Sequence, residues 1–258
     1  ILKGKASDVL LNGGKSESYA IVPDYYNGIL PKVVAKVGEK VKAGSVLMID
    51  KNRPEIKFVS PVSGEVTAVN RGEKRKVLSI VVKPDAQIEY EEFGKKNVAS
   101  LQGAEVKEVL LNAGMWPFIK QRPYDIVAAP LDTPRDIFVS AFYSAPLAPN
   151  FDFIVKGQEA DFQTGLNALA KLTNGKVYVG VRSGSVVSGM KGVEIVEVEG
   201  PHPAANVGVQ INHIKPVNKG EVVWTVNPAD VIVIGRLFNK GVADFSRMVA
   251  ITGSETTE

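Results

Sequence analysis

Residues 100–142 read SLQGAEVKEVLLNAGMWPFIKQRPYDIVAAPLDTPRDIFVSAF and predict a helix, a tight turn, a proline-interrupted connection and a buried strand. In the helix, apolar residues follow Val106 at the i, i+3, i+4, i+7 spacing of one buried face. Gly114 stands where a left-handed residue ends a helix. Residues 137–142 are β-branched and aromatic, and the run is short enough to be a central strand. This stretch therefore predicts an α/β domain.

The turn after this helix lies where α/β folds often carry a glycine-rich loop for a phosphate group. Such loops need glycine because backbone amides must approach the phosphate closely. Here Gly114 is followed by Met115, Trp116 and Pro117, and the proline has no amide to donate. We therefore expect that this loop has lost the chemistry of a nucleotide cradle.

Toward the N-terminus, residues 28–83 change to short strands separated by glycine and proline, after an irregular lead-in that predicts an extended arm or strand. Two glycines within residues 37–47 and the Ser-Pro-Val-Ser-Gly run at 60–64 resemble the barrel-sandwich hybrid of biotinyl and lipoyl domains. Glycine serves the turns of that fold because they need a positive φ. The strands expected here are 32–36, 46–50, 56–59, 65–70 and 77–82.

Lys51 lies in the hairpin that carries the modified lysine in true carrier domains. It follows Asp50, as in the lipoyl pattern, but the Asn-Arg-Pro run at 52–54 makes the hairpin longer than that pattern. We expect a solvated hairpin tip with Pro54 at its bend. A biotin- or lipoyl-carrier module remains an alternative function.

A polar connection at residues 84–98 predicts a domain boundary near residue 100. Residues 1–100 then hold the arm and the barrel-sandwich hybrid, and residues 101–258 hold an α/β domain in which helices and strands alternate. Asn227 is expected to cap a helix that has proline at its first position. The other elements expected are a helix at 158–172 and strands at 177–181, 194–198, 222–226 and 245–251.

Composition excludes several classes of protein. The apolar content of 45% and charged content of 23% are typical of a soluble globular protein. The net charge of +3 gives no case for nucleic acid, and no window approaches the roughly 18 apolar residues of a membrane span. Zero cysteines exclude disulfides and thiolate catalysis, and the two histidines, His202 and His213, lack the spacing of a metal site.

Catalytic and nucleotide motifs are not found in the sequence. There is no Gly-x-Ser-x-Gly elbow, no P-loop and no Gly-x-Gly-x-x-Gly after a strand. Gly157 and Gly200 stand where helix amides could bind an anion, but ordinary turns also explain both glycines. By residue chemistry alone, the chain is a two-domain α/β protein without a recognisable catalytic centre.

Several segments, taken in order, are specific to one family. They are KVGEKVKAG at 36–44, FVSPVSG at 58–64, NRGEKR at 70–75, Trp116, Arg122-Pro123, GPHPAANVG at 200–208 and DVIVIGRLF at 230–238. Over nearly all of its length, the chain resembles the family formed by the A subunit of the bacterial Na⁺-translocating NADH:quinone reductase. The resemblance implies that family chains continue beyond Glu258, so we expect this sequence to be a fragment.

The resemblance also implies a location and partners. Such a chain would be a peripheral subunit on the cytoplasmic face of the bacterial inner membrane, bound to the other subunits of a complex that oxidises NADH, reduces ubiquinone and exports sodium. The implied fold of residues 101–258 is Rossmann-like, shared with the FMN-binding subunit of respiratory complex I and with the C subunit of the Rnf complex. The implied chain holds no cofactor, because NADH and flavins are handled by other subunits, and is inactive alone.

A quinone site is the binding function that the resemblance suggests. A quinone ring needs an apolar slot and hydrogen-bond donors for its carbonyl oxygens, and strand ends in such folds often form one crevice. Alternatively, the aromatic residues fill the space left by a lost flavin, or the chain is a stand-alone flavin-dependent dehydrogenase. The candidate quinone-binding residues are Trp116, Phe118, Phe142, His202, Asn206 and Arg122.

Overall fold

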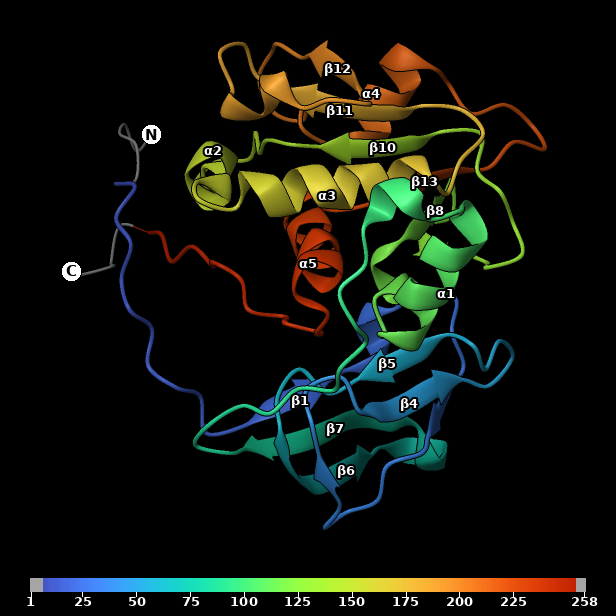
Figure 1. Ribbon diagram of the computed structural model, residues 1–258, viewed down its shortest axis with the longest axis vertical. Coiled ribbons are helices and arrows are strands. Elements are labelled where there is room, and N and C mark those ends of the chain that lie inside the picture. Colours follow the sequence, from blue (N-terminus) through green and yellow to red (C-terminus); the bar gives the residue numbers. More distant parts are fainter. Residues whose placement is uncertain (1–6, 254–258) are drawn as a thin grey trace.

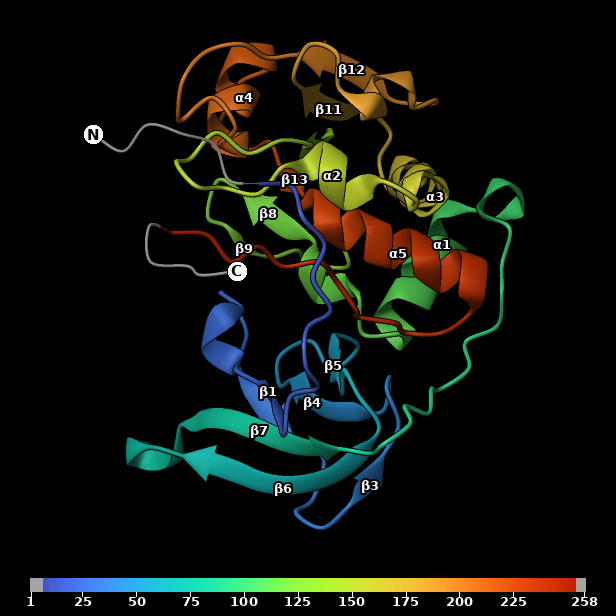
Figure 2. The same cartoon turned by 90° about the vertical axis from the view of Figure 1, so that its left-hand side faces the viewer.

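Strands from the first part of the chain form two small antiparallel sheets, and later strands form a six-stranded sheet with helices around it (Figure 1). The computed structural model describes residues 7–253. The first six residues of the expected N-terminal arm therefore lie outside the described residues. The two small sheets lie together at one end of the molecule and the six-stranded sheet at the other (Figure 2).

The N-terminal part contains one sheet in the order β1-β7-β6-β3 and another in the order β2-β4-β5. The predicted strands are present with ends shifted by one or two residues, except that β2 ends earlier than expected, and β3 was missed because it has two residues. The strands are β1 Tyr19–Ile21, β2 Pro31–Val33, β3 Lys40–Val41, β4 Val46–Asp50, β5 Lys57–Val59, β6 Gly64–Arg71 and β7 Val77–Pro84.

Gly64 explains why the Pro-x-x-Gly corner needs glycine. Its φ is +156°, and a Cβ at this position would lie 1.9 Å from the carbonyl oxygen of Lys83 on the neighbouring strand β7. Backbone therefore meets backbone where β6 leaves the corner, and any side chain would push the two strands apart. Inside this corner Val66, Ile80 and Val82 are buried in the core.

The C-terminal part is built on a mostly parallel sheet in the order β12-β11-β10-β13-β8-β9. Strand β10 pairs in parallel with β11 on one side and β13 on the other, which explains why all four of its residues are buried. The strand order reverses between β10 and β13. The strands are β8 Lys120–Arg122, β9 Ile126–Val127, β10 Ile137–Ser140, β11 Val177–Val181, β12 Glu194–Glu197 and β13 Val223–Thr225.

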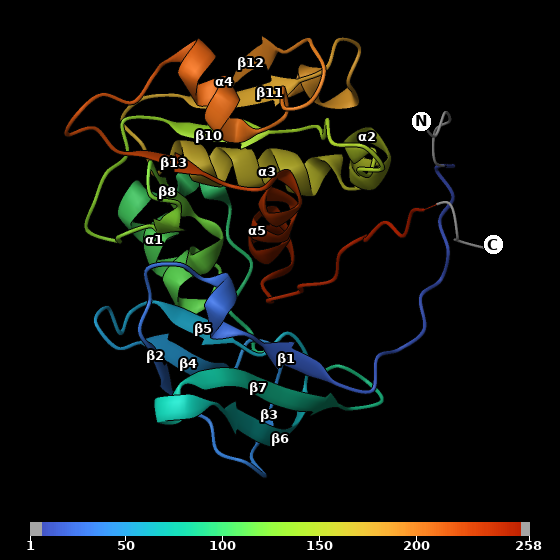
Figure 3. The same ribbon diagram turned by 180° about the vertical axis from the view of Figure 1, so that it is seen from behind.

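Helices α3 and α5 pack closely against each other beside this sheet, while α4 packs on Phe138 and Val223 through Ile211 (Figure 3). The α3–α5 contact depends on glycine. A Cβ on Gly165 would lie 2.0 Å from the carbonyl oxygen of Val231, so the helix backbones touch. The helices are α1 Gly103–Asn112, α2 Phe151–Val155, α3 Glu159–Ala170, α4 Val207–Ile214 and α5 Pro228–Lys240.

The helix ends confirm the expected caps. Gly114, after α1, has a φ of +67°. The Asn227 side chain accepts a hydrogen bond from the amide of Ala229 at 3.0 Å, and Pro228 is the first residue of α5. Helix α4 was missed, because the glycine–proline run before it and Gly208 within it predict a turn.

The expected strand at residues 245–251 is wrong, because these residues form no regular structure. The buried Arg236 of α5 holds the start of this segment instead. Its guanidinium donates to the carbonyl oxygens of Asp244 and Ser246 at 3.2 and 2.9 Å. These carbonyl groups are therefore satisfied by a side chain rather than by a neighbouring strand.

The connection between the two parts is bound to the second part before residue 100. The amides of Phe93 and Lys96 donate to the carbonyl oxygens of Gly241 and Phe238, at the end of α5. The division near residue 100 stays a prediction.

Arg53, in the β4–β5 hairpin, joins the two parts of the molecule. Its Nε donates to Asp50 Oδ2 at 2.7 Å, Nη2 to the carbonyl oxygen of Gly28 at 2.8 Å, and Nη1 to that of Val127 in β9 at 3.2 Å. Asp50 is 1% exposed. Lys51 and Pro54 are exposed, as expected of a solvated tip. Arg53, one of the residues that make this hairpin longer than the lipoyl pattern, therefore holds the hairpin against the α/β sheet.

We predict that Arg53→Ala lowers the free energy of unfolding by about 2 kcal/mol, because Asp50 would remain buried without its cation. Urea unfolding of the full chain measures this change. The matched control is Lys51→Ala, which removes an exposed cation two residues away and should alter stability by less than about 0.5 kcal/mol. Equal effects of the two substitutions would contradict the role given to Arg53.

Candidate functional site

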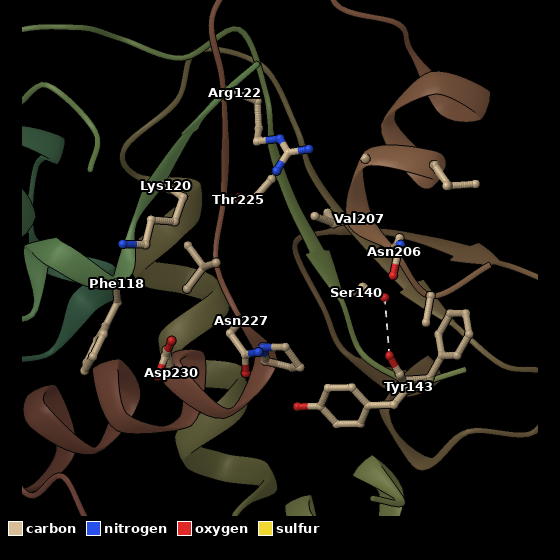
Figure 4. A pocket seen from close by; sticks show the side chains of 16 residues that line it. Phe118, Lys120, Arg122, Ser140, Tyr143, Asn206, Val207, Thr225, Asn227 and Asp230 are labelled. Atoms are coloured by element: carbon tan, nitrogen blue, oxygen red, sulfur yellow. Dashed lines mark hydrogen bonds between the residues drawn. The ribbon is translucent and has the colours of Figure 1, made fainter. Parts of the chain in front are cut away.

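A pocket of about 600 Å³ lies where the strand order reverses, at the carboxyl ends of β10 and β13 (Figure 4). Its walls also include strand β8 and the first residues of α4 and α5. Ligands of open α/β sheets commonly bind at this place, because the connections on either side of the reversal run to opposite faces. The position of the pocket therefore follows from the topology.

Four of the six candidate residues line this pocket: Phe118, Arg122, Phe142 and Asn206. They come from the turn after α1, from β8, from the segment after β10 and from the residue before α4. The structure thus brings together residues that are more than 80 positions apart in the chain. Trp116 and His202 are not among the lining residues.

Trp116 belongs to the core, which corrects its assignment as a ligand-facing residue. Its side chain is fully buried, and its Nε1 donates to the carbonyl oxygen of Ala128 at 2.8 Å. Its ring meets that of Trp224 edge to face, with 5.4 Å between centroids. Both the polar and the aromatic chemistry of this indole are therefore used inside the protein.

In the turn that contains Trp116, backbone amides donate to carbonyl oxygens of the same segment. The amide of Met115 donates to the carbonyl oxygen of Leu110, and the amide of Phe118 to that of Met115. Gly114 lies against the N-terminal part, since a Cβ there would be 2.5 Å from Val59 Cγ1. The turn at the position where related folds carry a phosphate loop is therefore covered by a strand of the barrel.

His202 supports the pocket from outside. Its exposed ring places Nδ1 3.1 Å from Ser144 Oγ, and the same hydroxyl accepts a hydrogen bond from the amide of Ala205 at 3.0 Å. Ala205 directly precedes Asn206, whose side chain does not cap α4. His202 therefore helps to fix the loop that presents Asn206.

Aromatic side chains line the pocket. Phe142 carries the Arg182 guanidinium 4.5 Å above its ring centroid, and Phe118 meets Phe245 edge to face at 6.1 Å. Tyr143 also lines the pocket and was missed by the sequence analysis. Burial raises the pKa of Tyr143, so its phenol is a neutral hydrogen-bond donor at pH 7.

Charged side chains also line the pocket, and two of them were missed. Lys120 and Arg122 lie two residues apart on β8, and Asp230 lies in the first turn of α5. Arg247 Nη2 donates to Asp230 Oδ1 at 2.8 Å. Burial raises the pKa of Asp230, and Arg247 opposes that shift. The Lys-x-Arg alternation is the sequence signal that would have placed Lys120 beside Arg122.

Arg122 reaches the start of α4. A Cβ on Gly208 would lie 2.8 Å from Arg122 Nη2, so the glycine makes room for the guanidinium. Arg122 Nη1 also donates to Asp125 at 3.1 Å, on the exposed side. Arg122 is therefore directed toward both the pocket and solvent.

The fold and the pocket define a class of protein: a barrel-like β domain joined to an α/β domain that carries a small-molecule site lined by aromatic and cationic side chains. Within residues 7–253, no helix is long and apolar enough to cross a membrane. In the same residues, no cluster of three or more histidine, aspartate or glutamate side chains could hold a metal ion. The arrangement has the shape and polarity of a binding site for a small molecule.

Comparison with known proteins identifies the family. Residues 1–85 match the NqrA N-terminal barrel-sandwich hybrid domain and residues 101–243 match the NqrA second alpha/beta domain. The chain therefore belongs to the NqrA family. These matches confirm the predicted barrel-sandwich hybrid and the α/β domain after it.

Similar proteins are named as the A subunit of Na(+)-translocating NADH-quinone reductase. The protein from Neisseria meningitidis is 36% identical over 261 residues, which cover 100% of this chain and 58% of that protein. The protein from Hahella chejuensis is 38% identical over 98% of this chain and 57% of its own length. The one from Photorhabdus laumondii is 35% identical over 98% and 58%. The chain thus spans less than two thirds of the length of these curated relatives.

We predict that Trp116→Ala lowers the free energy of unfolding by about 3–5 kcal/mol, because it empties a fully buried space and removes an indole hydrogen bond. Urea unfolding followed by circular dichroism measures the loss. Tyr124→Ala is the control, since this aromatic side chain is 78% exposed and should matter little. A normal stability for Trp116→Ala would place this side chain outside the core.

Proposed function

We propose that this chain is part of a peripheral subunit of a Na⁺-translocating NADH:quinone reductase and that its α/β pocket binds the ubiquinone ring. The observation that carries the proposal is the pocket at the strand reversal, which gathers Phe118, Phe142, Arg122 and Asn206 in a member of the NqrA family. The names of the relatives support the enzyme complex and its quinone substrate.

The pocket has the chemistry that a quinone ring requires. Its volume lies within the roughly 300–1,000 Å³ range of small-molecule sites. Phe118 and Phe142 offer apolar surface to a planar ring, while Arg122 and the amide of Asn206 can donate to its carbonyl oxygens. Tyr143 supplies a further neutral donor.

In this proposal the chain binds the other subunits of the complex, including its membrane subunits, on the cytoplasmic face of the inner membrane. It contributes to assembly and to the quinone site, and it is inactive alone. NADH and flavins are handled by the other subunits. The names of the relatives, which describe one lettered member of a larger complex, support the existence of such partners.

We also propose a Rossmann-like relationship to the FMN-binding subunit of complex I, with the flavin cradle lost. The order β12-β11-β10-β13 of the four parallel strands supports this relationship. The engaged amides at Met115 and Phe118, and the strand that covers Gly114, support the loss of the cradle.

FMN is therefore expected not to bind at residues 114–118 in the micromolar range, because the turn offers no open row of amides to its phosphate. Titration followed by flavin fluorescence measures affinity, and hydrogen exchange locates any site. Micromolar binding that protects the amides of this turn would contradict the proposal.

The quinone proposal predicts that Phe142→Ala and Asn206→Ala each weaken binding of a short-chain ubiquinone about tenfold, which corresponds to about 1.4 kcal/mol. The first change removes an aromatic lining side chain and the second removes a donor. Calorimetric titration of the folded chain measures affinity. His202→Ala should have a smaller effect, because this residue acts through the loop before Asn206.

Tyr124→Ala serves as the control for this experiment, since its exposed ring does not line the pocket. Each variant is first compared with the wild type by circular dichroism and urea unfolding. Unchanged affinity in folded Phe142→Ala and Asn206→Ala proteins would place the quinone outside this pocket.

A further inference from the structure

Lys120 stands out among the charged residues of the pocket because it has no acceptor. Its Nζ makes no hydrogen bond or ion pair with any of residues 7–253, although the side chain is about half buried. It lies over the Tyr26 ring, whose centroid is 5.1 Å from Nζ. Most ammonium groups removed from water are paired. Lys120 is thus an unpaired charge in the wall of a cavity.

The strand register fixes Lys120 in this wall. Lys120 lies opposite Thr225 in the antiparallel β8–β13 pair, and residues directly opposite each other point to the same face of a sheet. Thr225 also lines the pocket. The sheet register therefore fixes the face from which the Lys120 side chain leaves the backbone.

The other charges around the pocket are already engaged. Asp230 forms an ion pair with Arg247 at 2.8 Å, and Arg122 forms one with Asp125 at 3.1 Å. Asp125 and Asp230 favour the charged form of Lys120 from a distance, but burial is the larger effect and lowers the pKa of Lys120. An anion in the pocket would give this ammonium group the acceptor that the protein does not provide.

We propose that Lys120 is a specificity-determining residue of this pocket, which binds a quinone-class ring more tightly when one ring oxygen carries a negative charge. The proposal rests on the quinone function proposed above. The aromatic side chains of Phe118 and Phe142 contact the ring, and the ammonium group of Lys120 pairs with the charged oxygen. Binding alone is proposed, with no transfer of electrons or protons by this chain.

The test compares two ligands with the same ring system. One is 2-hydroxy-1,4-naphthoquinone, whose hydroxyl group is ionised at pH 7, and the other is uncharged 2-methyl-1,4-naphthoquinone. Calorimetric titration of the full 258-residue chain gives both affinities. The variants are Lys120→Met, which keeps the chain length without the charge, and Lys120→Arg, which keeps the charge. Lys219→Met is the matched control, since Lys219 is exposed and does not line the pocket.

We expect the wild type to bind the anionic ring about tenfold more tightly than the uncharged ring. Lys120→Met should lose this preference, because it removes the charge that pairs with the anionic oxygen. Lys120→Arg should retain most of the preference, and Lys219→Met should retain all of it.

Three outcomes would overturn the inference. Equal affinity of the wild type for the two rings would overturn it and leave the quinone proposal intact. A preference that persists in Lys120→Met would assign the selection to another group. Failure of the wild type to bind either ring would overturn the quinone proposal together with this inference. Circular dichroism and urea unfolding establish that each variant is folded.

Discussion

The burial of Trp116 against the α/β sheet, in a turn that also packs on the barrel, is the constraint on which the rest of the arrangement depends. The indole is anchored by Ala128 and packs edge to face on Trp224, while Gly114 brings the same turn against Val59. A turn that buries its ring in the α/β core and packs its glycine on the barrel cannot also present free amides to a phosphate. Phe118, two residues later, is the part of this turn that reaches the pocket. The loop thus forms a contact between domains and does not present its amides to a cofactor.

Much of the fold is predictable because its strongest patterns are local. The β-branched run of β10, the apolar face of α3 and the Asn-Pro start of α5 each specify an element from neighbouring residues. The failures are nonlocal. Residues 245–251 were expected to form a strand, but the buried Arg236 of α5 engages the carbonyl groups of Asp244 and Ser246, and no sequence pattern reveals that partner. Helix α4 was not predicted, because Gly208 within it indicates a turn. In the structure this glycine allows the close approach of the Arg122 guanidinium.

Residues of the candidate site could be predicted where the ends of the strands could be predicted. Phe142 and Asn206 follow from their positions near the reversal of strand order, once the α/β layer is assumed. Trp116 was misassigned because a short turn does not reveal which of its aromatic residues faces inward. Lys120 and Tyr143 were missed because each is an ordinary residue whose importance comes from what surrounds it.

Residues outside the pocket determine which of its charged side chains are paired. Asp230 is the acidic residue among the lining side chains, and it would offset Lys120 if it were unpaired. Arg247 binds Asp230 instead, and it reaches that position because Arg236 holds the preceding residues against α5. The irregular segment after α5, where the sequence predicted a strand, therefore leaves the ammonium group of Lys120 without an acceptor. The ligand charge preference proposed for the site therefore depends on packing at the far end of one helix.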